Sequence, residues 1–295
     1  MNDEELRNWL SREDVQRAYA PVKKLQDVLL GMLSDFDKLC AKNGLRYYLF
    51  YGTLLGAVRH GGFIPWDDDA DVVMPRGDYE KLLRLPKEML PSAYFIQSPY
   101  SEKYGRFAFA KFRKDGTTCI APAHKHIPMH HGIYIDIFPM DETTTGCGWL
   151  MWYLPRFFER LTAFSCANLP SKLRFLRPLQ KLWMRLFPAS IFARIGNAVA
   201  RSLSGHSGVY MNTFCTIRSK VDRRGWNASL FGEGRRINFD GVLLSSPDKS
   251  KKVLELLYGK WDELPSEKSR YPIHSDGGII DTCRDYKEYL HEHRT

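Results

Sequence analysis

Four aspartates within five residues, in the segment WDDDADVV at 66–73, are the residues of this chain best suited to chemistry. Carboxylates crowded in this way repel one another and raise each other's pKa, so a bound cation is the obvious reason to keep them together. If the segment enters a strand, Asp69 and Asp71 are two residues apart and share one face of that strand. Two carboxylates on one face can chelate a hard cation such as Mg²⁺ or Mn²⁺.

A third carboxylate, Asp136, lies alone in the apolar segment GIYIDIF at 132–138, which we expect to form another strand. Magnesium sites combine a few carboxylates with phosphate oxygens and water, so Asp136 would supply the third oxygen ligand. Three acids also allow a site for two metal ions. Asp69, Asp71 and Asp136 are therefore the candidate metal ligands.

These aspartates also have a purely structural interpretation. Asp67 and Asp68 would cap a turn, and the strand acids would pair with Arg59 or Arg76. This is the commoner role for a lone aspartate. Two acids on one strand face beside a phosphate-binding turn favour the metal site instead.

The elements that must position these acids begin with the aromatic, β-prone segment RYYLFY at 46–51, which predicts a buried strand leading into Gly52. Thr53 is then a good N-cap, and the following helix would run to Gly61 and Gly62. Free N–H groups and the positive end of the helix dipole would form a phosphate-binding site at this turn. For a Gly-Thr pair alone an ordinary turn is the commoner structure, but the neighbouring acids favour phosphate binding.

The rest of the first half mixes helices and strands. Apolar residues at steps of three and four over 22–40 predict a packed amphipathic helix. The segment ADVVM at 70–74 is typical of a short strand, and Asp78 would cap the helix that follows it. The segments at 106–114 and 117–121 predict two more strands. We therefore expect an α/β (α+β) protein with a mixed sheet flanked by helices.

The composition changes after Gly148. Residues 149–204 are aromatic, broken by prolines and basic, with Glu159 as their single acid, and we expect a set of helices there. The final third carries a strand-like segment at 237–245, a helix over 248–258 and a polar tail. The predicted division is a core over 1–148, a basic aromatic helical insertion over 149–215, and a C-terminal part over 216–295 that completes the core.

The bulk properties bound the class of protein. With 295 residues, 44% of them hydrophobic, the chain can bury one large core or two small ones. A formal net charge of +9 favours acidic partners, namely phosphorylated metabolites, anionic lipid or nucleic acid. The sequence contains no RNP signature, zinc finger or helix-turn-helix motif, so we do not expect a nucleic acid partner.

Cysteine usage and the N-terminal segment predict a cytoplasmic protein. The six cysteines form no CxxC pair, which is typical of a reducing compartment, and we expect no disulfides. The segment MNDEELRNWLSRED is polar and acidic, so no signal peptide is expected. Pro155, Arg156 and further charges interrupt the most apolar segment, at 149–169, so we do not expect it to span a membrane.

The order of YGT at a strand-to-helix turn, DAD on the next strand and YIDIF on a later one resembles the polymerase-beta-like nucleotidyltransferase superfamily. More narrowly, the chain resembles the LicD-type phosphotransferases, the family of phosphocholine transferases to which the fukutin-related ribitol-phosphate transferases are related. The matching segments lie at 51–82, 109–117 and 130–141, and more loosely at 239–265. Residues 149 to about 215 match nothing in this pattern.

This resemblance implies a nucleotidyltransferase-fold core. It also implies transfer of a phosphoryl-linked group from a CDP-activated alcohol, such as CDP-choline, to a sugar hydroxyl of a glycan or its precursor, with release of CMP. The metal-binding and catalytic acids would be Asp69, Asp71 and Asp136, and Asp136 would help to deprotonate the acceptor hydroxyl. Choline, ribitol and related alcohols would all be attached to the same CDP, so the resemblance does not determine which alcohol the donor carries.

Four cationic residues in the matched segments would hold the donor pyrophosphate: Arg59, His60, Lys111 and Arg113. Lys111 and Arg113 are two residues apart and share one strand face. The alternative for this pair is a solvated edge of the sheet, which we weigh about equally with phosphate binding.

Trp66, next to the aspartates, would stack on a base or close over a choline cation, unless it only packs on Phe63. The histidine-rich segment HKHIPMHH at 124–131 fits no standard zinc spacing. We expect this segment to shape the substrate site instead, with His131 as a contributor.

Residues 149–204 would also suit an anionic membrane surface, because aromatic and basic residues are interleaved there. Helical core packing explains the aromatic residues just as well, and we favour it slightly. A peripheral contact would place the enzyme at the inner face of the membrane, close to a lipid-linked acceptor. Two rival functions stay open: transfer of the nucleotide itself to a small molecule or sugar, and a catalytically idle glycan- or membrane-binding module.

Overall fold

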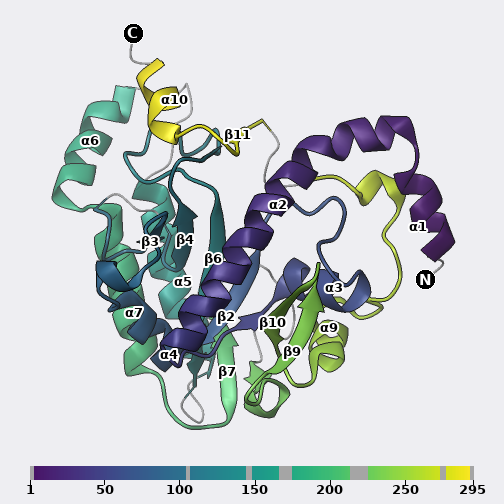
Figure 1. Cartoon of the computed structure of the whole chain (residues 1–295). Helices are drawn as coiled ribbons and strands as arrows, with labels where there is room; N and C mark the ends of the chain where they lie inside the picture. The colour runs from purple at the N-terminus through teal and green to yellow at the C-terminus, as the bar shows by residue number, and fades with distance from the viewer. Residues whose placement is uncertain are drawn as a thin grey trace.

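A mixed β-sheet forms the centre of the protein. The computed structural model describes residues 3–103, 107–143, 148–165, 175–212, 225–272 and 277–292. The described strands of the main sheet run in the order β1-β2-β6-β4-β3, and β7 pairs with β6 and then with β8 (Figure 1). Their bounds are β1 Tyr48–Leu49, β2 Asp71–Pro75, β3 Tyr94–Gln97, β4 Ala110–Lys114, β6 Tyr134–Glu142, β7 Val209–Asn212 and β8 Trp226–Asn227. Strands β2 and β6 are parallel and the other described pairs are antiparallel, which confirms the predicted α/β class with a mixed sheet.

Helices surround this sheet. In Figure 1 the long helix α2 crosses in front of it, while α5 and α7, which pack on each other, lie at the left. The bounds are α1 Asp3–Leu10, α2 Glu13–Lys42, α3 Tyr51–Arg59, α4 Arg76–Leu83, α5 Gly148–Ser165, α6 Arg177–Leu186, α7 Ala189–Ser202, α9 Ser250–Tyr258 and α10 Tyr286–Glu292. Short 3₁₀ turns occur at η1 Lys87–Met89, η3 Ala228–Leu230 and η4 Glu267–Ser269. The helices expected within 149–204 and near 248–258 are therefore confirmed.

Two small antiparallel pairs lie beside the main sheet. The hairpin of β9 (Arg235–Phe239) and β10 (Val242–Ser246) replaces the single strand-like segment expected at 237–245. Its turn is Asp240-Gly241, and both residues have positive φ, which suits a tight two-residue hairpin turn. Strand β11 (Ile279–Asp281) pairs with β5 (Thr118–Ile120), so the predicted polar tail in fact returns to the core.

Several predicted boundaries were wrong. The expected strand at 46–51 shrinks to two residues, because α3 already begins at Tyr51. Thr53 is not the N-cap, since Phe50 occupies that position and makes no side-chain cap hydrogen bond. Asp78 lies in the first turn of α4 rather than at its cap. The short strand β3 was not predicted at all.

A buried ion-pair network ties the helical segment to the core. The Arg76 guanidinium donates from Nε and Nη2 to the two carboxylate oxygens of Asp141, at 2.6 and 2.8 Å. Its Nη1 also donates to Asn197 Oδ1 on α7, at 3.0 Å, and Asn197 donates in turn to the carbonyl of Ala108 at 2.8 Å. Side chains from β6, α4 and α7 therefore meet in one buried polar cluster.

The described helices also bear on the membrane question. None of those in the described ranges is long and apolar enough to cross a membrane.

Cys40, Cys119 and Cys283 are free thiols, and the other three cysteines lie outside the described residues. The division at 148 and 215 stays a prediction.

Candidate active site

The parallel pairing of β2 with β6 brings two of the predicted acids together. Asp71, the first residue of β2, lies in register with Asp136 on β6. The backbone N–H of Asp136 donates to the carbonyl of Ala70 at 2.9 Å, which fixes this register at the strand start. Side chains at paired positions of neighbouring strands point to the same face, so two carboxylates far apart in the sequence become neighbours.

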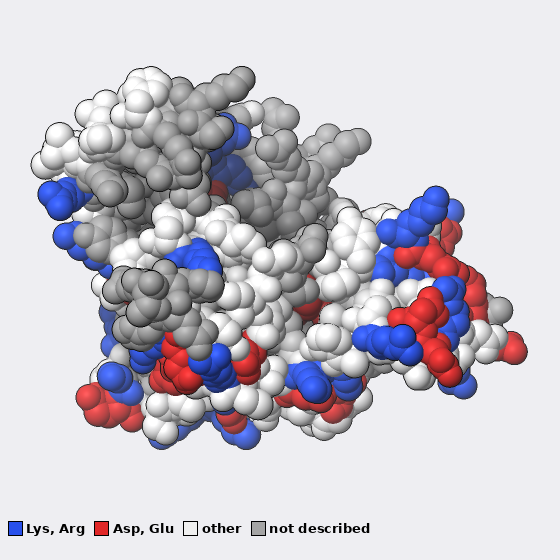
Figure 2. Space-filling view, turned by 90° about the horizontal axis from the view of Figure 1, so that it is seen from above, with Lys and Arg blue, Asp and Glu red and all other residues white. Residues whose placement is uncertain are grey.

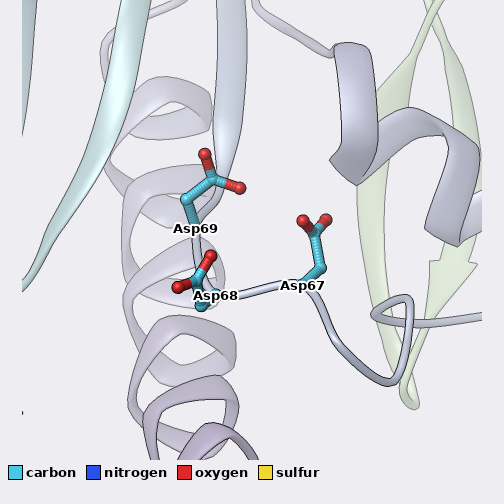
Figure 3. A group of neighbouring side chains, drawn as sticks. All are labelled: Asp67, Asp68 and Asp69. Carbon is cyan, nitrogen blue, oxygen red and sulfur yellow. The ribbon is translucent and has the colours of Figure 1, made fainter. Parts of the chain in front are cut away.

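Asp69 lies just before the strand, in the loop between α3 and β2. The prediction that Asp69 and Asp71 share one face of a strand was therefore wrong, because Asp69 does not belong to the strand. Instead, one carboxylate oxygen from each of Asp67, Asp68 and Asp69 lies within 4.8 Å of the other two. Figure 3 shows the three carboxylates pointing to the same side of this loop. Three successive side chains converge because the chain bends here instead of following the alternation of a strand.

The charges of this acid cluster act on one another. Burial raises the pKa of Asp71 well above its ordinary value, and the negative charges of Asp69, Asp136 and Asp67 raise it further. Burial also raises the pKa of Asp136, although the neighbouring Lys111 opposes this. Burial and mutual repulsion both disfavour the charged forms of Asp71 and Asp136, and a bound cation would oppose both effects.

Lys111 is a cation that contacts this cluster directly. It lies on β4 directly opposite Asp136 and forms a buried ion pair with it. Its ammonium also lies 3.5 Å from the ring centroid of Tyr134 and 4.2 Å from that of Phe107, a cation–π arrangement. Burial lowers the pKa of Lys111, and the Asp136 carboxylate opposes the shift. The solvated-edge alternative for Lys111 is wrong, because β4 lies inside the sheet.

Arg113 is also buried, and its partners belong to the fold. Its Nε donates to Gln97 Oε1 at 2.9 Å, and its Nη1 donates to the carbonyl of Gly132 at 2.7 Å. Burial lowers the pKa of this guanidinium. The side chain therefore braces β3 and the segment before β6, and the solvated-edge alternative fails here too.

The Gly-Thr turn is joined to the acids. A Cβ at position 52 would lie 2.8 Å from Asp67 Oδ2, so only glycine lets the Asp67 carboxylate approach the start of α3 this closely. The hydroxyl oxygen of Thr53 accepts a hydrogen bond of 2.8 Å from the backbone N–H of Asp71. Tyr51 has a φ of 44°, which is strained for a residue with a side chain. The turn therefore holds the loop of acids, a connection that its sequence did not predict.

Arg59 and His60 lie at the other end of α3. Arg59 Nη1 donates to the carbonyls of Trp261 and Glu263, at 3.0 and 3.2 Å, and its Nε donates to His60 Nε2 at 3.0 Å. Burial lowers the pKa of the Arg59 guanidinium, while the charge of Asp67 raises it. Arg59 is thus an electrostatic neighbour of the acid cluster that also ties α3 to the C-terminal third.

Trp66 is buried among residues that are distant from it in the sequence. Its ring lies 5.6 Å from that of Trp9 in an edge contact, and the Arg270 guanidinium lies 5.7 Å from its centroid. His60 approaches at 6.5 Å. The structure places this ring between α1 and the C-terminal third rather than in an open site.

His131, the last residue of the histidine-rich segment at 124–131, is buried. Its Nε2 donates to the carbonyl of Ile127 at 2.9 Å, and burial lowers its pKa to about 4, so the ring is neutral. In the described ranges the only group arranged to hold a metal is Asp67, Asp68 and Asp69, and no histidine belongs to it. His131 therefore contributes a buried, hydrogen-bonded ring to this part of the fold.

Sequence reasoning missed how this site is closed. Asp68 and Asp69 line a small hollow together with Tyr134 on β6 and Ile280 on β11. The α2 side chain Leu25 completes the wall. The pairing of β11 with β5 brings Ile280 here, and no periodicity within the polar tail indicates that pairing. The only signal in the sequence that this tail packs on the core is its pair of adjacent isoleucines, Ile279 and Ile280.

The site lies in the part of the chain that is similar to known proteins. Residues 44–180 match the family model described as LicD/FKTN/FKRP, nucleotidyltransferase domain, and this range holds the acid cluster and Lys111. The lipopolysaccharide cholinephosphotransferase LicD of Haemophilus influenzae is 47% identical over 62 residues, 21% of this chain and 23% of that protein. An uncharacterized protein of Rickettsia prowazekii is 35% identical over 133 residues, 45% of this chain and 46% of that protein.

A more distant likeness extends to a eukaryote. The mannosyltransferase regulator 4 of Saccharomyces cerevisiae is 29% identical over 128 residues, 41% of this chain and 10% of that protein. The matched segments span less than half the length of each of these three relatives. The resemblance indicated by the sequence motifs is nevertheless confirmed by the family match, and the domain at residues 44–180 belongs to the LicD family.

Proposed function

We propose that this chain is a metal-dependent transferase that moves a substituted phosphate from a CDP-activated alcohol onto a sugar hydroxyl of a glycan or its lipid-linked precursor. CMP is the leaving product. The observation that carries the proposal is the pairing of Asp71 with Asp136 beside the group Asp67–Asp69, within a LicD-family domain. Phosphocholine is the favoured group, because the Haemophilus relative is named a lipopolysaccharide cholinephosphotransferase.

The residues present fit a hard divalent cation. The cluster offers only carboxylate oxygens, the donors that Mg²⁺ and Mn²⁺ prefer, and mutual repulsion raises the pKa of Asp71. Asp69, Asp71 and Asp136 would hold the ion, and Asp67 and Asp68 would be further donors, because they lie beside Asp69. When bound, the ion would supply positive charge for the donor phosphates and the departing CMP.

The chain's own groups would activate the acceptor. The acceptor oxygen attacks the β-phosphorus in line, the bond from that phosphorus to the oxygen bridging to CMP breaks, and CMP leaves with the electron pair. Asp136 would take the proton of the acceptor hydroxyl, because its raised pKa makes it a better proton acceptor than an ordinary carboxylate. Lys111 would hold Asp136 in position through their ion pair.

The test is CMP release from a panel of CDP-alcohols and sugar nucleotides with Mg²⁺ or Mn²⁺. We expect release from one donor, lost in Asp71→Asn and in Asp69→Asn and retained in Asp27→Asn, which changes an exposed aspartate on α2. Full activity of Asp71→Asn would refute the assignment of the acids. Release of pyrophosphate would mean attack on the α-phosphorus and would replace this proposal with nucleotide transfer. If no donor gives CMP release and calorimetry detects no donor binding, a catalytically idle binding module would be favoured.

A further inference from the structure

Helix α6 exposes the apolar stripe that a packed helix would bury. Its apolar residues Leu179, Leu182, Trp183 and Leu186 recur at steps of three, one and three, so they share one face. Their exposed fractions are 64%, 53%, 41% and 61%. Helical core packing, the interpretation favoured slightly for the aromatic residues of 149–204, is therefore not what the exposed Trp183 of α6 shows.

Neighbouring residues extend this uncovered apolar area. Phe175 and Phe187 flank α6 and are both exposed, and Ile191 and Ile195 follow on α7. Helix α5 carries a second exposed row with a spacing of four, made of Trp149, Tyr153 and Phe157. We call these exposed apolar side chains of α5, α6 and α7, with the flanking Phe175 and Phe187, the insertion surface. Exposed apolar side chains gathered on neighbouring helices in this number are typical of an interaction site rather than of an ordinary solvated surface.

The charge around the insertion surface selects the partner. Residues 149–204 contain nine lysines and arginines but only one acid, so they carry nearly the whole net charge of +9. Among the described ones, Arg160 and Arg185 are exposed. At the upper left of Figure 2, on the side where α6 lies in Figure 1, the described surface is mostly white with blue groups at its edge. A second copy would oppose this basic surface to itself, which costs free energy, whereas an anionic surface complements it.

We propose that the insertion surface binds the surface of an anionic phospholipid bilayer, with α6 lying in the plane of the interface. Its leucines and Trp183 would enter the boundary between headgroups and acyl chains, and the arginines would meet the lipid phosphates. Helix α6 has ten residues and is too short to cross the bilayer. The proposal goes beyond the transferase activity, since it concerns elements outside the acid cluster.

The test is flotation of the full chain with vesicles of phosphatidylcholine alone or mixed with about one third phosphatidylglycerol. We expect binding to the anionic vesicles only, weakened strongly at ~0.5 M salt. The double variant Leu182→Glu/Leu186→Glu should bind at least about tenfold more weakly, because it places acids in the contact. Leu243→Glu, which changes a residue of β10 with 56% exposure, should bind like the wild type.

Three results would overturn the proposal. One is absence of binding to anionic vesicles at low salt, and another is equal binding to neutral vesicles. The third is a dimer, seen by light scattering after size exclusion, that the Leu182→Glu/Leu186→Glu variant converts to monomer without any vesicle binding. Circular dichroism must show that both variants are folded, which their exposed positions predict. Failure here would leave the CMP-release assay unaffected, so the two proposals can fail separately.

Discussion

Replacing Lys111 by methionine tests the electrostatic account of the candidate site most directly. Methionine has a similar length and keeps apolar contact with Phe107 and Tyr134, but it removes the only charge that the structure pairs with Asp136 in the described ranges. Asp136 would then remain largely buried beside Asp71 without an ion-pair partner at contact distance among the described residues. An uncompensated buried carboxylate is among the costliest changes that a fold can suffer.

The magnitude follows from burial and charge. Two unit charges about 4 Å apart attract by about 4 kcal/mol at an effective dielectric constant of about 20. Breaking a buried pair by removing one partner typically costs about 3–5 kcal/mol. For a chain of this size we therefore expect the melting temperature of Lys111→Met to fall by roughly 10 °C.

The assay is thermal unfolding followed by circular dichroism, with Lys114→Met as the matched control. Lys114 lies on the same strand, is half-buried and has no such buried ion pair, so its loss should cost less than about 1 kcal/mol. If the acids hold a divalent cation, Mn²⁺ should restore part of the stability of Lys111→Met, because the ion supplies the missing charge. Equal melting temperatures for the wild type and Lys111→Met would refute the reasoning.

Three further predictions concern the turn, the core and a buried histidine. Gly52→Ala should displace the Asp67 carboxylate, because the new Cβ would lie 2.8 Å from Oδ2, and should lower the CMP-release rate about tenfold or more while the chain stays folded. Arg76→Met should cost about 3–5 kcal/mol of unfolding free energy in urea, and adding Asp141→Leu should recover much of it; an additive double variant would contradict the pairing. The folded-state pKa of His131, about 4, lies below the ordinary value of 6.5, so the unfolded chain binds the proton first and stability falls as pH drops through that window. The measurement is urea unfolding of the wild type and of His131→Gln at pH 7.5 and 4.5. The free energy of unfolding should fall between these pH values by about 2–3 kcal/mol less in the variant than in the wild type. An equal fall in both proteins would exclude this role of His131.

Local patterns were enough to predict much of this protein. The mixed α/β class, the strands at 70–74 and 132–138 and the helices within 149–204 all follow from periodicity and composition, because these signals lie within a few consecutive residues. The segments at 51–82, 109–117 and 130–141 indicate the LicD family, and the family match over residues 44–180 confirms this resemblance. The boundaries near Gly52 failed, because the strained Tyr51 starts its helix earlier than capping rules allow.

Other features required the tertiary structure, because periodicity says which face a residue occupies but not what lies opposite. The pairing of Asp71 with Asp136, and of Asp136 with Lys111, depends on which strands become neighbours and in which register. The bend before β2 decides that Asp67, Asp68 and Asp69 converge. Amphipathic spacing in α6 is the same whether its apolar face is covered or open, and only the packed fold leaves it open to solvent.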